Sequence, residues 1–104
     1  MTRNEIIEIA QALADTLPTS DPQVYAANVR ICALDPRLLK VRHFVQTLTY
    51  ERIRPQYRLD LVTAYGPDHG LVGRVNEKTR AVYAETRRRM VAEYYDNEID
   101  KDPS

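Results

Sequence analysis

The sequence lacks the features that mark several common protein classes. Cys32 is the only cysteine, so no intramolecular disulfide can form. No apolar run approaches the roughly 18 residues that a membrane span requires. The first residues, Met1 to Glu5, pass directly into an amphipathic pattern instead of the continuous apolar stretch of a signal peptide. We therefore expect no membrane contact and a reducing, cytoplasmic compartment.

Net charge is also missing, because 15 basic residues balance 15 acidic ones. Since 43% of the residues are hydrophobic, this balance argues against a disordered chain, which combines low hydrophobicity with high net charge. A length of 104 residues suits one domain, which we place at residues 1–97, followed by a flexible acidic tail at residues 98–104. Arginine outnumbers lysine 12 to 3, a composition that fits a bacterium or its phage.

What the sequence does contain is helical periodicity divided by prolines. Apolar residues recur every three or four positions and predict helices at about residues 3–17, 22–34, 36–54, 55–65 and 77–97. The fold class is therefore all-α, a compact bundle of four to five helices with a long, partly exposed C-terminal helix. A strand at residues 44–50 is the main alternative, because this stretch is β-branched and aromatic, but its apolar spacing is that of a helix.

Local signals define the expected helix ends. Thr2 and Glu5 have the spacing of a capping box, and Asp21-Pro22 and Asp35-Pro36 each combine an N-cap with a proline at the first helical position. Because proline lacks an amide donor, we expect every proline from Pro18 to Pro55 to lie at a helix end. Residues 66–75 hold all three glycines and are expected to form the longest loop, with Asn76 capping the last helix. The residues expected in the core are Ile6, Leu13, Ile31, Leu38, Val45 and Leu48.

Charge is distributed unevenly along the chain. The net charge is −3 over residues 1–35, +5 over residues 36–59 and −2 over residues 60–104. The basic middle either complements the acidic flanks internally or forms a surface for an acidic protein or for nucleic acid. In a nucleic-acid complex, the contacts would be Arg37, Lys40, Arg52 and Arg54.

The last expected helix has an unusually thin apolar stripe. Its members are Val82, Tyr83, Met90, Val91 and Tyr94. Tyrosine, methionine and arginine are enriched at interfaces, so we interpret Tyr83, Arg87, Met90 and Tyr94 as a partner-binding surface. The alternative is a peripheral helix that lies on its own chain, with the stem of Arg87 along apolar surface.

Residues suited to catalysis are few and scattered. Cys32, His43 and His69 are not three or four residues apart, so no metal site is expected. Asp68-His69 is the one pair that resembles chemistry, but adjacent turn residues usually point apart and no nucleophile accompanies them. We expect no enzyme activity, cofactor or small-molecule ligand.

The sequence thus favours a small non-enzymatic interaction protein that acts through a helical surface. An adaptor, an inhibitor or a virion or assembly component would fit, as would many phage or bacterial accessory proteins. The partner would be a protein or a second copy of the chain, most simply in a homodimer. The alternative is a DNA-binding domain that uses residues 36–59.

Overall fold

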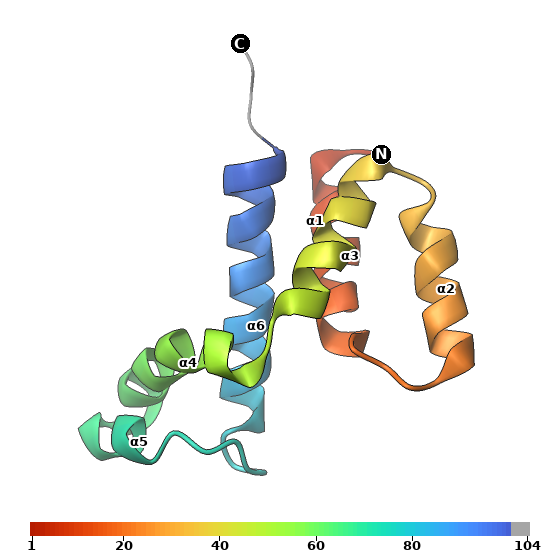
Figure 1. Ribbon diagram of the computed structural model, residues 1–104. Coiled ribbons are helices and arrows are strands. Elements are labelled where there is room, and N and C mark those ends of the chain that lie inside the picture. Colours follow the sequence, from red (N-terminus) through yellow and green to blue (C-terminus); the bar gives the residue numbers. More distant parts are fainter. Residues whose placement is uncertain (101–104) are drawn as a thin grey trace. The chain divides into compact units, whose positions relative to one another are not determined.

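The computed structural model describes residues 1–100, and these are almost entirely helical (Figure 1). Six α-helices follow one another: α1 (Arg3–Thr16), α2 (Pro22–Cys32), α3 (Pro36–Thr47), α4 (Tyr50–Tyr65), α5 (Pro67–Val72) and α6 (Arg80–Tyr94). A π-helical turn, η1 (Tyr95–Ile99), continues α6. No strand occurs in these 100 residues, so the all-α prediction is confirmed and the strand alternative at residues 44–50 is wrong.

Contacts within the chain group it into two compact units. The first, called unit 1, comprises residues 1–47 and 90–104, and the second, unit 2, comprises residues 48–89. The division falls within α6, between Arg89 and Met90. The single domain expected at residues 1–97 stays a prediction. Of the expected acidic tail, residues 98 and 99 lie in η1 and residue 100 caps it. Residues 101–104 lie outside the described part of the chain.

Unit 1 is organised around α3, which packs against both α1 and α2. Its helices begin where the sequence predicts. The Thr2 hydroxyl accepts from the Glu5 amide at 3.2 Å, and the Glu5 carboxylate accepts from the Thr2 amide at the same distance. Asp21 accepts from the Gln23 amide at 2.9 Å at the start of α2, and Asp35 accepts from the Arg37 amide at 2.9 Å at the start of α3.

Most of the expected core is buried, with one exception. Ile6, Leu13, Leu38, Val45 and Leu48 are at most 5% exposed. Ile31 is only half-buried, because α2 turns Asn28 and Cys32 inward instead. The prediction for Ile31 is therefore wrong.

Unit 2 departs from the predicted boundaries at Pro55. The third helix ends at Thr47 and not at Arg54, and the Thr49 hydroxyl accepts from the Arg52 amide to begin α4. Pro55 therefore lies inside α4, at its sixth residue, so the expectation that it marks a helix end is wrong. The restriction that proline places on its predecessor is a bias, which the cap at Thr49 and the burial of Ile53 and Tyr57 outweigh.

The expected loop at residues 66–75 is also wrong, since it contains α5. Gly66 has φ +107° and ψ 168°, a conformation open essentially to glycine alone, and it allows the sharp turn between α4 and α5. Gly73, at φ +61°, ends α5 in the left-handed conformation. The glycines therefore delimit a helix that begins at Pro67.

The last helix starts later than predicted. The Asn76 side chain accepts from the Thr79 amide at 3.1 Å, and the Thr79 hydroxyl accepts from the Asn76 amide at 3.0 Å. This reciprocal pair caps a turn at residues 77–79, and α6 follows at Arg80. Asn76 therefore acts as a cap, as expected. The element that it caps is the turn before α6 and not α6 itself.

Candidate interaction surface

The aromatic residues proposed on the last helix pack against their own chain. In unit 2, the half-buried Tyr83 ring lies edge-on to the Tyr57 ring, with centroids 5.2 Å apart, and 6.1 Å from the Tyr50 ring. Burial raises the pKa of the Tyr83 phenol. In unit 1, the Tyr94 ring stacks on Phe44 with centroids 3.9 Å apart.

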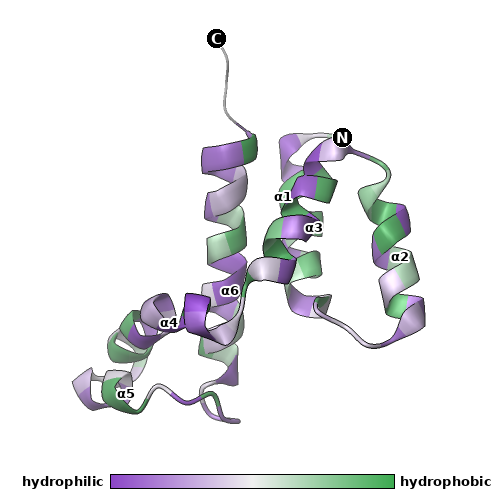
Figure 2. Cartoon of the chain, in the orientation of Figure 1, coloured by the Kyte–Doolittle hydropathy of each residue, from purple (hydrophilic) through white to green (hydrophobic). Residues whose placement is uncertain are grey.

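The other positions of α6 are similarly engaged. Arg87 and Met90 are half-buried, and Thr86 and Val91 are fully buried. The partner-binding role of Tyr83, Arg87, Met90 and Tyr94 stays a prediction. The contacts of the Tyr83 and Tyr94 rings agree with the alternative, in which the last helix packs on its own chain. In Figure 2, α6 is coloured mainly as hydrophilic, in keeping with its thin apolar stripe.

The basic segment at residues 36–59 is divided between the units. Arg37 and Lys40 lie on α3 in unit 1, whereas Arg52 and Arg54 lie on α4 in unit 2. Lys40, Arg52 and Arg54 are exposed. The four residues proposed for nucleic-acid binding therefore do not belong to one compact unit.

Arg37 has acceptors within its own unit. Its guanidinium donates to the Asp35 carboxylate at 2.8 Å, to the Met1 carbonyl at 3.0 Å and to the Tyr95 hydroxyl at 3.3 Å. The hydrogen bond from Arg37 lowers the pKa of Asp35 to about 2. Arg42, on the same helix, is buried with its guanidinium 4.9 Å from the centre of the Tyr25 ring. In α3, Arg37 thus pairs with an acidic residue of its own unit, whereas Arg42 lies against an aromatic ring.

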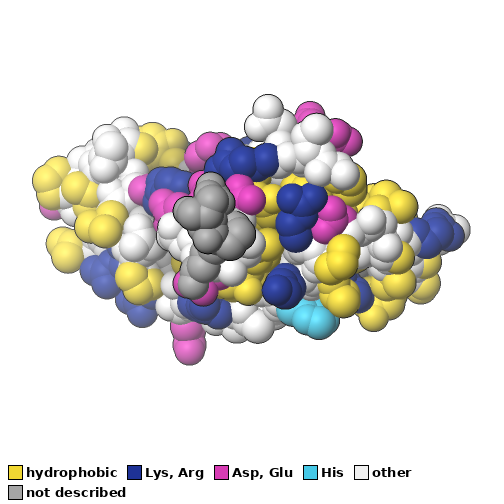
Figure 3. Space-filling model, turned by 90° about the horizontal axis from the view of Figure 1, so that it is seen from above, with side chains coloured by type: hydrophobic (Ala, Val, Ile, Leu, Met, Phe, Trp, Pro, Cys, Tyr) yellow, Lys and Arg dark blue, Asp and Glu magenta, His cyan; other side chains and the backbone are white. Residues whose placement is uncertain are grey.

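A groove between α4 and α5 is the main surface that the sequence did not reveal. It is lined by Pro55, Arg58, Leu59, Val62, Pro67, Gly70 and Leu71, and its volume is about 350 Å³. Both leucines of the groove are largely exposed to solvent, Leu59 at 62% and Leu71 at 75%. Hydrophobic side chains accordingly gather over α4 and α5, at the left of Figure 3. We call this surface the α4–α5 groove.

The close approach of the two helices forms the floor of the groove. A Cβ atom at Gly70 would lie only 2.6 Å from Cγ2 of Val62, so a larger residue at that position would require the Val62 side chain to shift. The Arg58 guanidinium donates to the Gly70 carbonyl on the same side. The sequence signal was the spacing of Leu59 and Val62, which places both off the buried stripe of Ile53, Tyr57 and Leu61.

A second cavity in unit 2 holds polar groups that satisfy one another. It has a volume of about 410 Å³ and is lined by residues of α4 and α6 that include Asp60 and Arg89. Arg89 donates to both carboxylate oxygens of Asp60, at 2.9 and 3.1 Å, and the buried Thr86 hydroxyl donates to the same carboxylate. The arrangement is that of a structural ion pair, with the carboxylate occupied by donors from α6.

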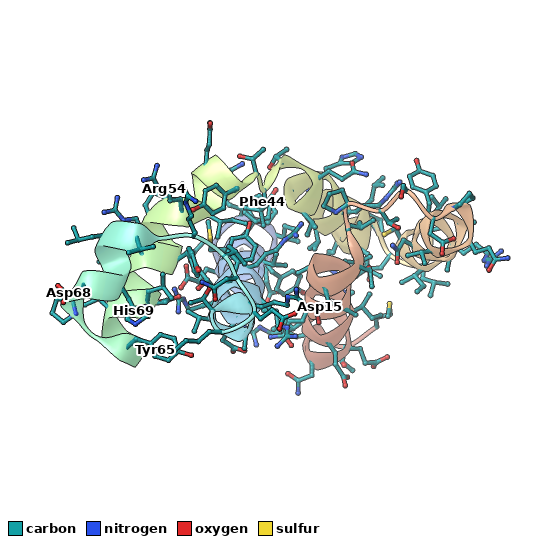
Figure 4. All side chains as sticks on the ribbon, turned by 90° about the horizontal axis from the view of Figure 1, so that it is seen from below. Asp15, Phe44, Arg54, Tyr65, Asp68 and His69 are labelled. Carbon is teal, nitrogen blue, oxygen red and sulfur yellow. The ribbon has the colours of Figure 1, made fainter. Side chains whose placement is uncertain are left out.

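The residues considered for chemistry lie apart from one another. Cys32 is buried in unit 1, and this burial raises the pKa of its thiol. His69 lies in unit 2 with its ring 5.0 Å from the Tyr65 ring, while the exposed Asp68 lies at the outer edge of α5 (Figure 4). His43 is exposed on α3. Over residues 1–100, no three His, Cys, Asp or Glu side chains are placed to hold a metal ion.

Within the described residues, none of the helices has the length and apolar character needed to cross a bilayer. Searches against protein-family models, curated proteins and solved structures give no significant match, so the candidate surface is defined by its geometry alone.

Proposed function

We propose that this chain is a non-enzymatic interaction protein that binds another macromolecule through the α4–α5 groove. An adaptor, an inhibitor or an assembly component would act in this way. The observation that carries the proposal is the exposure of Leu59 and Leu71 on either side of an apolar groove. Contiguous exposed apolar surface is typical of binding sites, and a groove between helices is suited to the apolar face of an amphipathic helix.

Charge indicates the kind of partner. Unit 2, residues 48–89, has nine basic and five acidic residues, a net charge of +4. Arg58 lines the groove, and Arg54 lies one helical turn before it on α4. Long-range attraction would therefore favour a protein surface of net negative charge.

Site-specific photocrosslinking tests the proposal. A photoreactive amino acid in place of Leu71 is expected to give a discrete adduct in an extract of the source cells, and the same amino acid at the exposed Glu77, outside the groove, is expected to give none. Leu59→Gln should abolish the adduct, whereas the matched Leu39→Gln on α3 should leave it unchanged. Equal adducts from both positions, or none from Leu71, would remove the groove as a binding site.

DNA binding is the second candidate, and the net charge of unit 2 is the observation in its favour. Arg52 and Arg54 are the contacts that this unit retains from the predicted set. Their joint replacement by glutamine should then reduce the binding of duplex DNA and flatten its salt dependence. A parent protein that causes no gel shift at low salt would eliminate this candidate.

A further inference from the structure

The outer face of α2 is a second exposed apolar surface in the described part of the chain. It consists of Pro22, Ala26, Val29 and Ala33, the last of which caps the helix, and all four are exposed. Tyr25, at the edge of this face, lies against Arg42 of α3. At 100° per residue the four residues of the face occupy a sector about 60° wide. Arg30 is the only charged residue between Pro22 and Cys32, and it lies outside this sector.

A helix that is apolar on both sides is normally covered on both sides. The inner side of α2, with Asn28 and Cys32, faces α3 in unit 1. Figure 2 shows several hydrophobic residues along α2, and Figure 3 shows hydrophobic side chains exposed over it, at the right of the view. The outer face of α2 therefore has the character of a helix that docks into a groove.

We propose that the occupant of the α4–α5 groove is α2 of a second copy of this chain. The inference rests on the proposed function and names its partner. The two surfaces are complementary in shape, because one is the exposed face of a helix and the other is a groove between two helices. Both are apolar at the centre.

The units that carry the two surfaces have opposite net charges. Unit 1, residues 1–47 and 90–104, carries six basic and ten acidic residues, a net charge of −4, against +4 in unit 2. Pairing two grooves would bring together two units of net charge +4, and pairing two α2 faces would bring together two units of −4. Contact between unit 1 of one copy and unit 2 of another opposes unlike charges, so it is favoured over both symmetric arrangements.

The geometry of such a contact determines the form of the assembly. Each copy would offer one α2 face and one groove, and a contact between different surfaces forms rings or open chains. A single helix in a groove is a small interface, so the association should be weak and dependent on concentration. It should also weaken with rising salt, since unlike net charges contribute to it.

A complementation experiment tests the proposal with purified protein. The groove variant is Leu59→Gln with Leu71→Gln, and the face variant is Ala26→Gln with Val29→Gln. All four positions are exposed, and Leu39→Gln is the matched control. Mass is measured by sedimentation and light scattering from about 1 µM to about 500 µM, the range in which interfaces of this size dissociate.

Each arrangement predicts a different set of masses. The parent and the Leu39→Gln control should rise with concentration beyond twice the monomer mass of 12.0 kDa. Each double variant alone should remain a monomer, because it retains only one of the two surfaces. An equimolar mixture should form a dimer and nothing larger, since one intact groove and one intact α2 face are then available.

Three results would overturn the proposal. They are a parent that stays monomeric throughout, a dimer that persists in either double variant, and a mixture that stays monomeric although the parent associates. Failure here is distinguishable from failure of the proposed function. A monomeric parent whose Leu71 crosslinks to a foreign acidic protein would refute self-association alone, and a monomeric parent without any adduct would refute both.

Discussion

The buried hydroxyl of Tyr57 offers a quantitative test of how unit 2 is held together. It lies 2.9 Å from the Arg74 carbonyl and 2.8 Å from the Thr79 hydroxyl, and so connects α4 to the segment between α5 and α6. The Thr79 hydroxyl is itself 3.1 Å from the Arg74 carbonyl. In Tyr57→Phe, Thr79 can therefore still donate to that carbonyl, and the expected loss of stability is about 1 kcal/mol, the usual net value of one hydrogen bond.

The double variant Tyr57→Phe, Thr79→Val should behave differently. It removes both side-chain donors from the partly buried Arg74 carbonyl, and an unsatisfied acceptor of this kind costs about 1 kcal/mol, the low end of the range for fully buried groups. The loss should therefore exceed the sum of the single losses by about 1 kcal/mol. Urea unfolding followed by circular dichroism measures all three values, with Tyr25→Phe in unit 1 as a control expected to change stability by less than about 0.5 kcal/mol. Additivity within about 0.3 kcal/mol would refute a shared acceptor.

Three further predictions concern the core, a charged pair and a turn. Leu13→Ala, at a position 1% exposed, should destabilise the protein by about 2–5 kcal/mol, and a denaturation midpoint equal to that of the 69% exposed Leu34→Ala would contradict the assigned inner face of α1. The Asp35 carboxyl, with a pKa of about 2 against an ordinary 3.8, should stabilise the fold above pH 3.8 and lose this contribution as pH falls through 2. Carbon-13 NMR should show this pKa return toward 3.8 in Arg37→Gln, and an unchanged value would exclude the hydrogen bond as its cause. Gly66→Ala should cost about 1–3 kcal/mol through backbone strain alone, because no atom lies within 4 Å of the added Cβ, and an unaltered urea midpoint would show that the turn relaxes freely.

Several helix starts could be predicted because their signals are local. The pair Thr2 and Glu5 and the dipeptides Asp21-Pro22 and Asp35-Pro36 form caps from groups no more than three residues apart. Such hydrogen bonds form in the same way whatever the helix later packs against.

Boundaries marked by single prolines and glycines were predicted less well. Pro55 was expected to end a helix but lies inside α4, where burial of neighbouring side chains outweighs one missing amide donor. Gly66 and Gly73 were expected in a loop but enclose α5. A glycine in the sequence shows that a turn is possible at that position, but it does not show whether the residues up to the following glycine form a loop or a helix.

The α4–α5 groove could not be predicted, because it depends on contact between two elements. At its floor, Gly70 lies so close to Val62 that a larger residue there would displace the Val62 side chain. The sequence places Leu59 off the buried stripe of α4 but cannot say that Leu71 stands across a groove from it.

The sequence by itself determined the helical class, five of the six expected core residues and the local caps, since these follow from the spacing of residues along one helix. The tertiary structure decided which charges and apolar faces act together. It divided the basic segment at residues 36–59 between two units and gave the rings of Tyr83 and Tyr94 packing partners within the chain. It also left the outer face of α2 exposed. Surfaces of this kind are made by residues distant in sequence, and only the packing of helices against one another shows which faces remain uncovered.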